Sequence, residues 1–290
     1  MMFKLYSDVK AFYGDVYDVL MKKEAQNMLI LGNLIIGYEG KDTFGWRNTA
    51  EWAMAAVSCD EKIRLVALMT PPYGITMYAC GDFDKELDCL IDGLISSRIN
   101  VPAVIAEKSL AAAFAEKYCI KMGLGQEIAM SQRIYQLDTV NLNVPQIGRF
   151  READERDLSF MPFWYEDFFA SATNIDAKIG GDIEKYRHVV TSGKTFLLED
   201  NGCAVSVAMI SRQTASAACV SYVYTPPYFR GRGYASSVVA QLSQKCLDEG
   251  FKSCVLYTDL KNPTSNSIYK KIGYKPIADS LEIKFYEVKK

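Results

Sequence analysis

Residues 223–236, which read as a strand, a glycine turn and a helix start, constrain the fold more than any other stretch. Residues 222–224 are aromatic and β-branched, as is typical of a strand, and Pro226 and Pro227 end it because proline donates no ladder hydrogen bond. Two glycines follow, and apolar residues then recur at helical spacing until Gly250. The first amides of a helix have no partner within it, and glycine lets an anion approach them closely. The stretch therefore predicts a phosphate site at a helix N-terminus.

Two familiar glycine motifs do not fit this stretch. A P-loop requires Gly-Lys-Ser/Thr, which the chain lacks here. A dinucleotide fingerprint requires a third glycine, where Ser236 stands, and a surrounding βαβ unit. The preceding segment instead predicts an antiparallel hairpin, with strands at 196–198 and 205–210 around the turn residues 199–202.

The motif that fits is Arg-x-x-Gly-x-Ala, carried by Arg230, Gly233 and Ala235. It resembles the coenzyme A pyrophosphate loop of the GNAT superfamily of N-acetyltransferases. A second motif follows in the order of that superfamily: Asn262 after a strand, Tyr269 seven positions later on a helix, and then a Gly-Tyr pair. The two motifs span the last third of the chain. The residues around them resemble those of a bacterial group of predicted acetyltransferases.

The resemblance implies a role for each matching residue. The pyrophosphate would be bound by the residues of the helix start, which are Arg230, Gly231, Arg232, Gly233, Tyr234, Ala235 and Ser236. Val223 and Thr225 would pair with the pantetheine arm, and a backbone amide there would stabilise the oxyanion. Asn262, assisted by Ser265 or Asn266, would bond to the same arm. The alternative for Asn262 is a helix cap before a proline.

Tyr269 would act as the catalytic general acid that protonates the departing thiolate. Its alternative is a tyrosine that packs under the last strand.

The sequence does not identify the residue that acts as general base. Many relatives carry a Glu on a central strand, but Tyr257 stands five residues before the Asn motif. Asp259, Glu166, Asp167 and a water-mediated route are the alternatives. His188, the single histidine, is expected on the surface of a helix, and no cluster of metal ligands is present.

An internal repeat organises the rest of the chain. Residues 70–73 are identical to residues 225–228, and similar elements follow both. The paired segments are a helix at 84–97 with one at 234–249, a strand at 101–105 with one at 253–257, a helix at 109–119 with one at 264–272, and a strand at 127–136 with one at 281–287.

This repeat predicts an α/β protein with mixed sheets and two GNAT-like domains in tandem, at 1–138 and 146–290, joined by a linker around 137–147. The first copy is degenerate, because residues 73–76 stand where the glycine loop should be and the Asn…Tyr pair is missing. We expect it to bind no coenzyme A and to serve as a structural or acceptor-side partner.

The second copy also contains a candidate acceptor wall. Residues 154–171 read as mostly helical, with Pro162 predicting a kink or a break into two helices. In the superfamily, helices at this point wall the acceptor pocket. The aromatic residues of the segment, which could equally be plain core, are Phe163, Trp164, Phe168 and Phe169.

Composition limits the remaining classes. The 290-residue chain is 49% apolar with a net charge of −2, so no bulk attraction to nucleic acid or membrane is expected. Eight scattered cysteines without a C-x-x-C pair, and the absence of a signal-like start, predict a reduced cytoplasmic protein. A homodimer is compatible with the sequence, which does not decide it.

The leading hypothesis is an N-acetyltransferase that uses acetyl-CoA and a primary amine in a ternary complex. The two-copy plan also resembles amino-acid N-acyltransferases such as the glycine N-acyltransferases, which favours a small amine or amino acid over a peptide. The alternative is an acyl-CoA-binding sensor or assembly module without catalysis. An aminoacyl-tRNA transferase is weaker, because it demands a basic groove.

Overall fold

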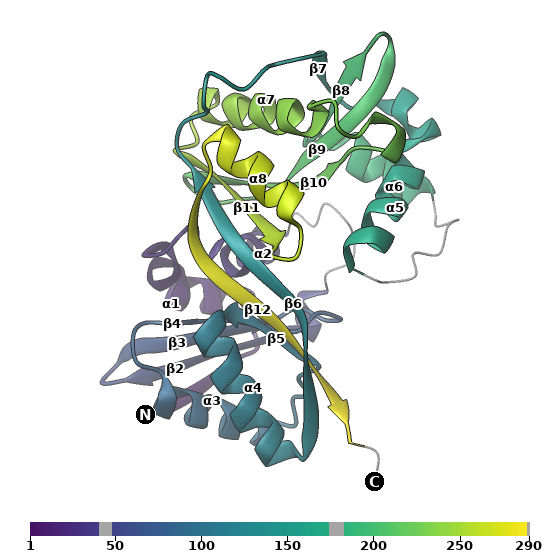
Figure 1. Ribbon diagram of the computed structural model, residues 1–290. Helices are drawn as coiled ribbons and strands as arrows, with labels where there is room; N and C mark the ends of the chain where they lie inside the picture. The colour runs from purple at the N-terminus through teal and green to yellow at the C-terminus, as the bar shows by residue number, and fades with distance from the viewer. Residues whose placement is uncertain (41–47, 174–182, 289–290) are drawn as a thin grey trace.

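The computed structural model describes residues 1–40, 48–173 and 183–288, which form one twelve-stranded mixed sheet flanked by helices (Figure 1). The strand order is β1-β2-β3-β4-β5-β12-β6-β11-β10-β9-β8-β7. The strands of the N-terminal half are β1 (Met2–Tyr6), β2 (Ala53–Cys59), β3 (Lys62–Met69), β4 (Ile75–Ala79), β5 (Ala103–Glu107) and β6 (Leu124–Leu137). Those of the C-terminal half are β7 (Arg149–Glu152), β8 (Thr195–Asp200), β9 (Cys203–Gln213), β10 (Ala217–Tyr224), β11 (Ser253–Asp259) and β12 (Lys275–Glu287).

Helices pack on the two faces of this sheet. They are α1 (Val9–Met21), α2 (Met28–Glu39), α3 (Asp84–Ser96), α4 (Lys108–Met122), α5 (Met161–Thr173), α6 (Ile183–Val190), α7 (Tyr234–Asp248) and α8 (Pro263–Ile272). In the N-terminal half one core lies between the sheet and α3 and α4, and another between the sheet and α1 and α2. In the C-terminal half α7 and α8 cover one face, and α5 and α6 cover the other.

Local sequence signals explain several of these elements. The Asp8 side chain caps α1 by accepting a 2.8 Å bond from the amide of Ala11, and the apolar stripe of α1 is fully buried. The β8–β9 hairpin turns at Asn201 and Gly202, whose φ angles are 49° and 78°. Two left-handed residues are typical of a tight hairpin turn, which confirms the hairpin predicted from the sequence.

The two halves repeat one strand plan. β1 to β4 pair in antiparallel fashion and β4 pairs with β5 in parallel, while β7 to β10 are antiparallel and β10 pairs with β11 in parallel. The predicted α/β fold with two similar copies is therefore confirmed.

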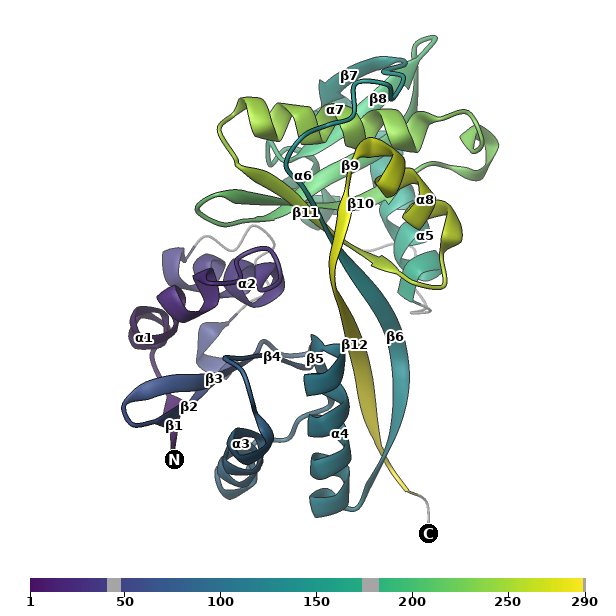
Figure 2. The same ribbon diagram turned by 60° about the vertical axis from the view of Figure 1, so that its left-hand side comes forward.

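The closing strands are exchanged between the halves. β6 leaves the N-terminal half and pairs with β11, while β12 returns from the C-terminal half and pairs with β5. The two strands also pair with each other over most of their length, and a two-pronged ion pair between Arg133 and Asp279 joins them at 2.7 and 2.9 Å. Figure 2 shows this long ribbon running between the two halves.

The alignment through the repeated tetrapeptide is wrong. Residues 70–73 precede β4, whereas residues 225–228 follow β10, and β4 and β10 are the equivalent strands. The tetrapeptide match had aligned β3 with β10. The segment that replaces the glycine loop in the N-terminal half is therefore the turn at residues 80–83, not residues 73–76.

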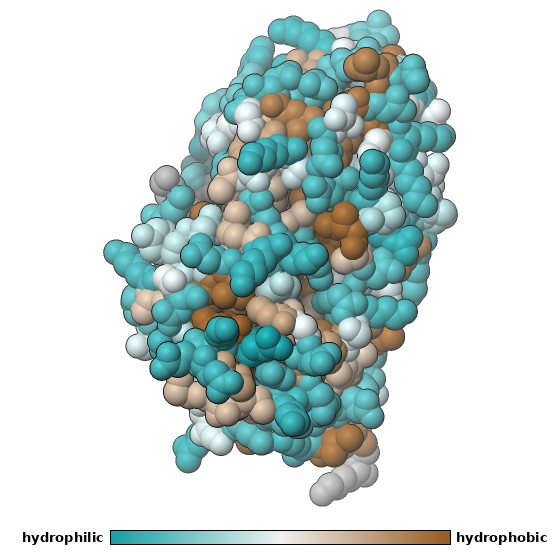
Figure 3. Space-filling view, turned by 90° about the vertical axis from the view of Figure 1, so that its left-hand side faces the viewer, coloured by the Kyte–Doolittle hydropathy of each residue, from teal (hydrophilic) through white to brown (hydrophobic). Residues whose placement is uncertain are grey.

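The prediction at Pro162 is confirmed as a break. A 3₁₀ turn (Glu155–Ser159) precedes α5, and Pro162 lies in the first turn of α5, where its missing amide hydrogen leaves no acceptor unsatisfied. All eight cysteines are free thiols, and four of them are buried. On the face shown in Figure 3, hydrophilic side chains predominate and apolar ones gather in small patches. Among the described helices, none is long and apolar enough to cross a membrane.

Candidate functional site

The predicted site begins where β10 and β11 part. Their parallel register ends at Cys219 and Val255, although β10 continues to Tyr224 and β11 to Asp259. A bulge lies in the diverging part of β10, where Tyr222 has a φ of 49°. The two strands therefore open in a V, along which backbone groups face a gap instead of each other.

The glycine turn leads from this opening into α7. Gly231 and Gly233 have φ angles of 77° and 84°, and a Cβ at Gly231 would meet nothing within 4 Å. No side chain caps α7, and its first turn contains no acidic residue. Within the described residues, the amides of residues 231–236 donate no hydrogen bond to the protein. These open amides at the positive end of a helix fit a diphosphate group.

Side chains around the turn hold its shape. The Nε of Arg230 donates to the backbone oxygen of Thr225 at 2.9 Å, and the guanidinium of Arg232 lies 5.2 Å from the centre of the Tyr228 ring. Both arginines are exposed, so they place positive charge beside the open amides. Thr225 is further fixed by a 2.9 Å hydroxyl contact with Ser206.

The remaining predicted residues of the turn are partly or fully covered. Tyr234 is buried and its hydroxyl donates to the carboxylate of Asp200, so this side chain anchors the helix start. Ala235 and Ser236 are half-buried in the first turn of α7. Val223 packs against the core beneath α7, which leaves its backbone as the part that can pair with a ligand.

The second motif lies on the same face of the sheet, because α8 packs beside α7 (Figure 1). Asn262 caps α8 by accepting a 3.0 Å bond from the amide of Ser265, as the alternative interpretation predicted for its oxygen. Asn262 remains exposed, and Ser265 is half-buried. The neighbouring Asn266 accepts a 3.0 Å bond from the hydroxyl of Tyr135.

Tyr269 is 7% exposed and packs between Tyr135 on β6 and Tyr274, with ring centres 6.4 and 6.0 Å away. Burial raises the pKa of Tyr269 to about 12, and a hydrogen bond with Ser265 offsets part of that rise. Tyr269 is therefore a neutral phenol, able to donate a proton, across the whole physiological range.

The opposite face of the V carries a cluster of aromatic side chains and two carboxylates. Tyr222 and Tyr224 project from β10 toward α5, where their rings lie 5.1 Å from Phe168 and 5.8 Å from Trp164, respectively. The hydroxyl of Tyr222 is buried without a partner among the described residues, and burial holds its pKa well above the usual value. Two of the four aromatics predicted for the acceptor wall thus contact β10, whereas Phe163 is 60% exposed.

The candidate bases separate clearly by geometry. Asp167 is exposed and accepts a 2.5 Å bond from the hydroxyl of Tyr224, at the end of β10, whereas Glu166 is buried and accepts a 2.7 Å bond from Tyr186. The hydroxyl of Tyr257 accepts a 3.1 Å bond from the amide of Leu29 in the N-terminal half.

Two other sequence candidates lie at other places in the structure. Asp259 is engaged in the turn before α8, where its Oδ1 accepts a 2.8 Å bond from the amide of Lys261. His188 is exposed on α6, as predicted. No group of three or more metal-ligating side chains occurs in the part of the chain that the structure describes. The hydrogen bond between Tyr224 and Asp167 was not predicted from the sequence, because it joins residues 57 positions apart on β10 and α5.

The N-terminal half has the same V but a different helix start. β4 and β5 pair only at residues 75–76 and 104–105 before they part. The first turn of α3, however, contains Asp84 and Glu86, and Asp82 precedes it. Three carboxylates at this point repel a diphosphate, whereas the first turn of α7 has none.

The chain has the GNAT fold, present in two tandem copies, of which the N-terminal one lacks the glycine loop. A family model described as FR47-like protein matches residues 204–282. No curated protein matches the chain.

Three solved structures illustrate the likeness of fold. A GCN5-related N-acetyltransferase from Sphaerobacter thermophilus is 14% identical with a TM-score of 0.60, covering 98% of this chain and 95% of its own. A GNAT-family acetyltransferase from Colwellia psychrerythraea is 13% identical with a TM-score of 0.55, covering 98% and 99%. A tandem GNAT protein from the clavulanic acid biosynthesis pathway is 9% identical with a TM-score of 0.57, covering 98% of each chain.

Proposed function

We propose that the C-terminal half binds acetyl-CoA and transfers the acetyl group to a primary amine, of a small molecule or an amino acid, by direct attack in a ternary complex. The observation that carries this proposal is the set of open amides at residues 231–236 beside the diverging strands β10 and β11. Acetyl-CoA, when bound, supplies a thioester carbonyl and a thiolate leaving group.

The residues of the chain divide the remaining work. The open amides, with Arg230 and Arg232, hold the diphosphate. The backbone of β10 near Val223 orients the extended arm and offers an amide to the oxyanion. Tyr269 donates the proton that the leaving sulfur needs.

We assign the base to Asp167. It lies at the acceptor face of the V, and its bond to Tyr224 positions it at the end of β10. A carboxylate at this place removes the proton of the incoming amine, directly or through one water. Burial and the Asp167 bond raise the pKa of Tyr224, so the phenol of Tyr224 stays protonated and positions the carboxylate instead of acting as a base.

The test adds one charge to the first turn of α7. Ser236→Asp introduces the kind of carboxylate that α3 carries, and Ser236→Asn is its neutral isostere. An acidic residue near a helix N-terminus stabilises the helix, so weaker binding does not arise from unfolding. We expect the Asp variant to bind acetyl-CoA at least about ten-fold more weakly, which is about 1.4 kcal/mol, and the Asn variant to bind nearly as the wild type.

If both variants bind acetyl-CoA with equal affinity, the start of α7 is not part of the binding site. Acetyl-CoA binding by the wild type without thiol release, across a panel of amines and amino acids, would instead favour the binding module without catalysis.

A further inference from the structure

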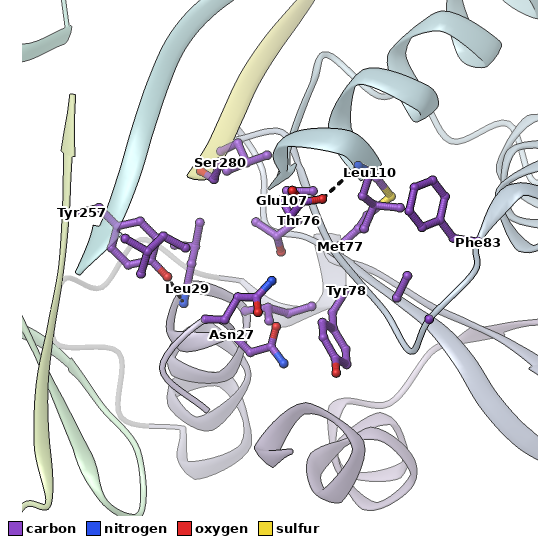
Figure 4. A pocket seen from close by; sticks show the side chains of 17 residues that line it. Asn27, Leu29, Thr76, Met77, Tyr78, Phe83, Glu107, Leu110, Tyr257 and Ser280 are labelled. Atoms are coloured by element: carbon purple, nitrogen blue, oxygen red, sulfur yellow. Dashed lines mark hydrogen bonds between the residues drawn. The ribbon is translucent and has the colours of Figure 1, made fainter. Parts of the chain in front are cut away.

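A cavity lies in the V of the N-terminal half, beneath the start of α2. Its volume is about 250 Å³, and its walls come from α2, β4, β5 and also from β11 and β12 of the C-terminal half. Figure 4 shows Asn27, Tyr78, Tyr257 and Ser280 arranged around the hollow. This cavity is distinct from the V between β10 and β11.

The interior of the cavity offers hydrogen bonds that the protein does not use. Ser280 is 4% exposed and its hydroxyl has no partner among the described residues, although it lines the cavity. A buried hydroxyl without a partner is unfavourable, so a ligand atom that bonds to it gains affinity. Tyr257 can still donate its hydroxyl hydrogen, because that oxygen only accepts from Leu29. Apolar side chains such as Met77 and Ile134 line part of the wall, and the other polar residues that line it are Gln26, Asn27, Thr76, Tyr78 and Glu107. Glu107 is engaged at the start of α4, where its Oε2 accepts from the amides of Ser109 and Leu110 at 3.0 and 3.4 Å.

The mouth of the cavity is basic. A neighbouring groove shares Gln26, Tyr78, Ala79 and Gly81 with the cavity, so the two hollows adjoin. The groove is further lined by Lys22, Lys23, Lys62 and Arg64. Among these four cations, Arg64 alone forms an ion pair in the described structure, a loose contact of 3.9 Å with Glu86, although Asp60 and Glu61 precede Lys62 in the sequence. Four cations with so little compensation attract an anion.

We propose that this cavity binds a small organic anion, with an apolar body and an amide or hydroxyl group. Its negative group lies at the basic mouth near Lys62 and Arg64, and its polar group reaches the hydroxyl of Ser280. A volume of about 250 Å³ suits a small molecule. The N-terminal copy is thus a separate ligand site, independent of the proposed transfer reaction.

The experiment uses the full chain and two matched probes, N-acetyl-L-leucine and its neutral amide, N-acetyl-L-leucinamide. Binding is measured by calorimetry at millimolar concentrations. We expect the acid to bind at least about ten-fold more tightly than the amide, a difference of about 1.4 kcal/mol. Lys62→Gln combined with Arg64→Gln abolishes that preference, whereas Lys284→Gln, on the exposed end of β12, leaves it unchanged.

The interior is tested separately with Ser280→Ala. Removing an unpaired buried hydroxyl leaves the thermal unfolding midpoint unchanged or raises it, while affinity for N-acetyl-L-leucine falls by about three- to ten-fold. Equal binding of the acid and the amide, no saturable binding of either, or full affinity in the double variant would each overturn the proposal. A lower affinity in the Lys284 variant would show that general surface charge, not the mouth, attracts the acid.

Discussion

Replacing Tyr269 with phenylalanine tests the chemistry most directly. Burial raises the pKa of Tyr269 to about 12, against about 10 for a free tyrosine, so the folded protein favours the neutral phenol by roughly 3 kcal/mol. The side chain therefore keeps its proton until the departing thiolate needs it. A positioned general acid contributes about 10²- to 10⁴-fold to a rate, so we expect kcat to fall at least about a hundred-fold in Tyr269→Phe.

Affinity and stability should change far less. Phenylalanine fills the same space between Tyr135 and Tyr274, and the lost hydrogen bond with Ser265 costs about 1 kcal/mol of stability. The assay is thiol release from acetyl-CoA with an amine that the wild type accepts, together with calorimetric binding of coenzyme A. Tyr274→Phe is the matched control, because it removes another buried hydroxyl, 2.8 Å from that of Ser243, in the same core.

The pH dependence adds a second check. The phenol's pKa is higher in the folded than in the unfolded state, so its contribution to stability is complete below pH 10 and disappears as pH rises toward 12. No loss of activity between pH 7 and 10 should therefore arise from this residue. If Tyr269→Phe keeps kcat within about two-fold of the wild type, or if Tyr274→Phe slows the reaction equally, Tyr269 is not the acid.

Two further predictions concern the base and the number of sites. Asp167→Asn keeps an oxygen for the bond from Tyr224 but loses its basicity, so kcat should fall about a hundred-fold near neutral pH and recover partly at high pH, where more of the amine is neutral; an unchanged pH profile would contradict the assignment. Calorimetry should give one coenzyme A per chain, because Asp84 and Glu86 oppose a diphosphate at α3; a second equivalent site would show that the N-terminal copy also binds it.

Local features were predicted best because short-range chemistry determines them. The two residues that turn the β8–β9 hairpin, and the glycines before α7, require left-handed backbone that few other residues adopt. The break before α5 follows from one proline for the same reason. Such signals depend on neighbours in sequence, and the structure agrees with each of them.

The register of the repeat and the partner of each long strand could not be obtained this way. The identical residues at 70–73 and 225–228 lie on opposite ends of equivalent strands, so identity over four residues matched β3 with β10, although the four element pairs that follow were predicted correctly. The alternation of side chains along β6 and β12 would be the same whichever strand each of them paired with, so the sequence does not indicate their partners. The contact of Asp167 with Tyr224 likewise spans 57 positions and arises only from the packing of α5 on β10.

The exchange of closing strands also affects how the protein is made. β5 is flanked on one side by β12, the last of the twelve strands to be synthesised, so the N-terminal half has an open edge until residues 275–287 have been added. The N-terminal half therefore cannot complete its sheet as it emerges, because β12 must first be synthesised and pair with β5 and β6. Ending translation a few residues before β12 would therefore damage the half that was synthesised first.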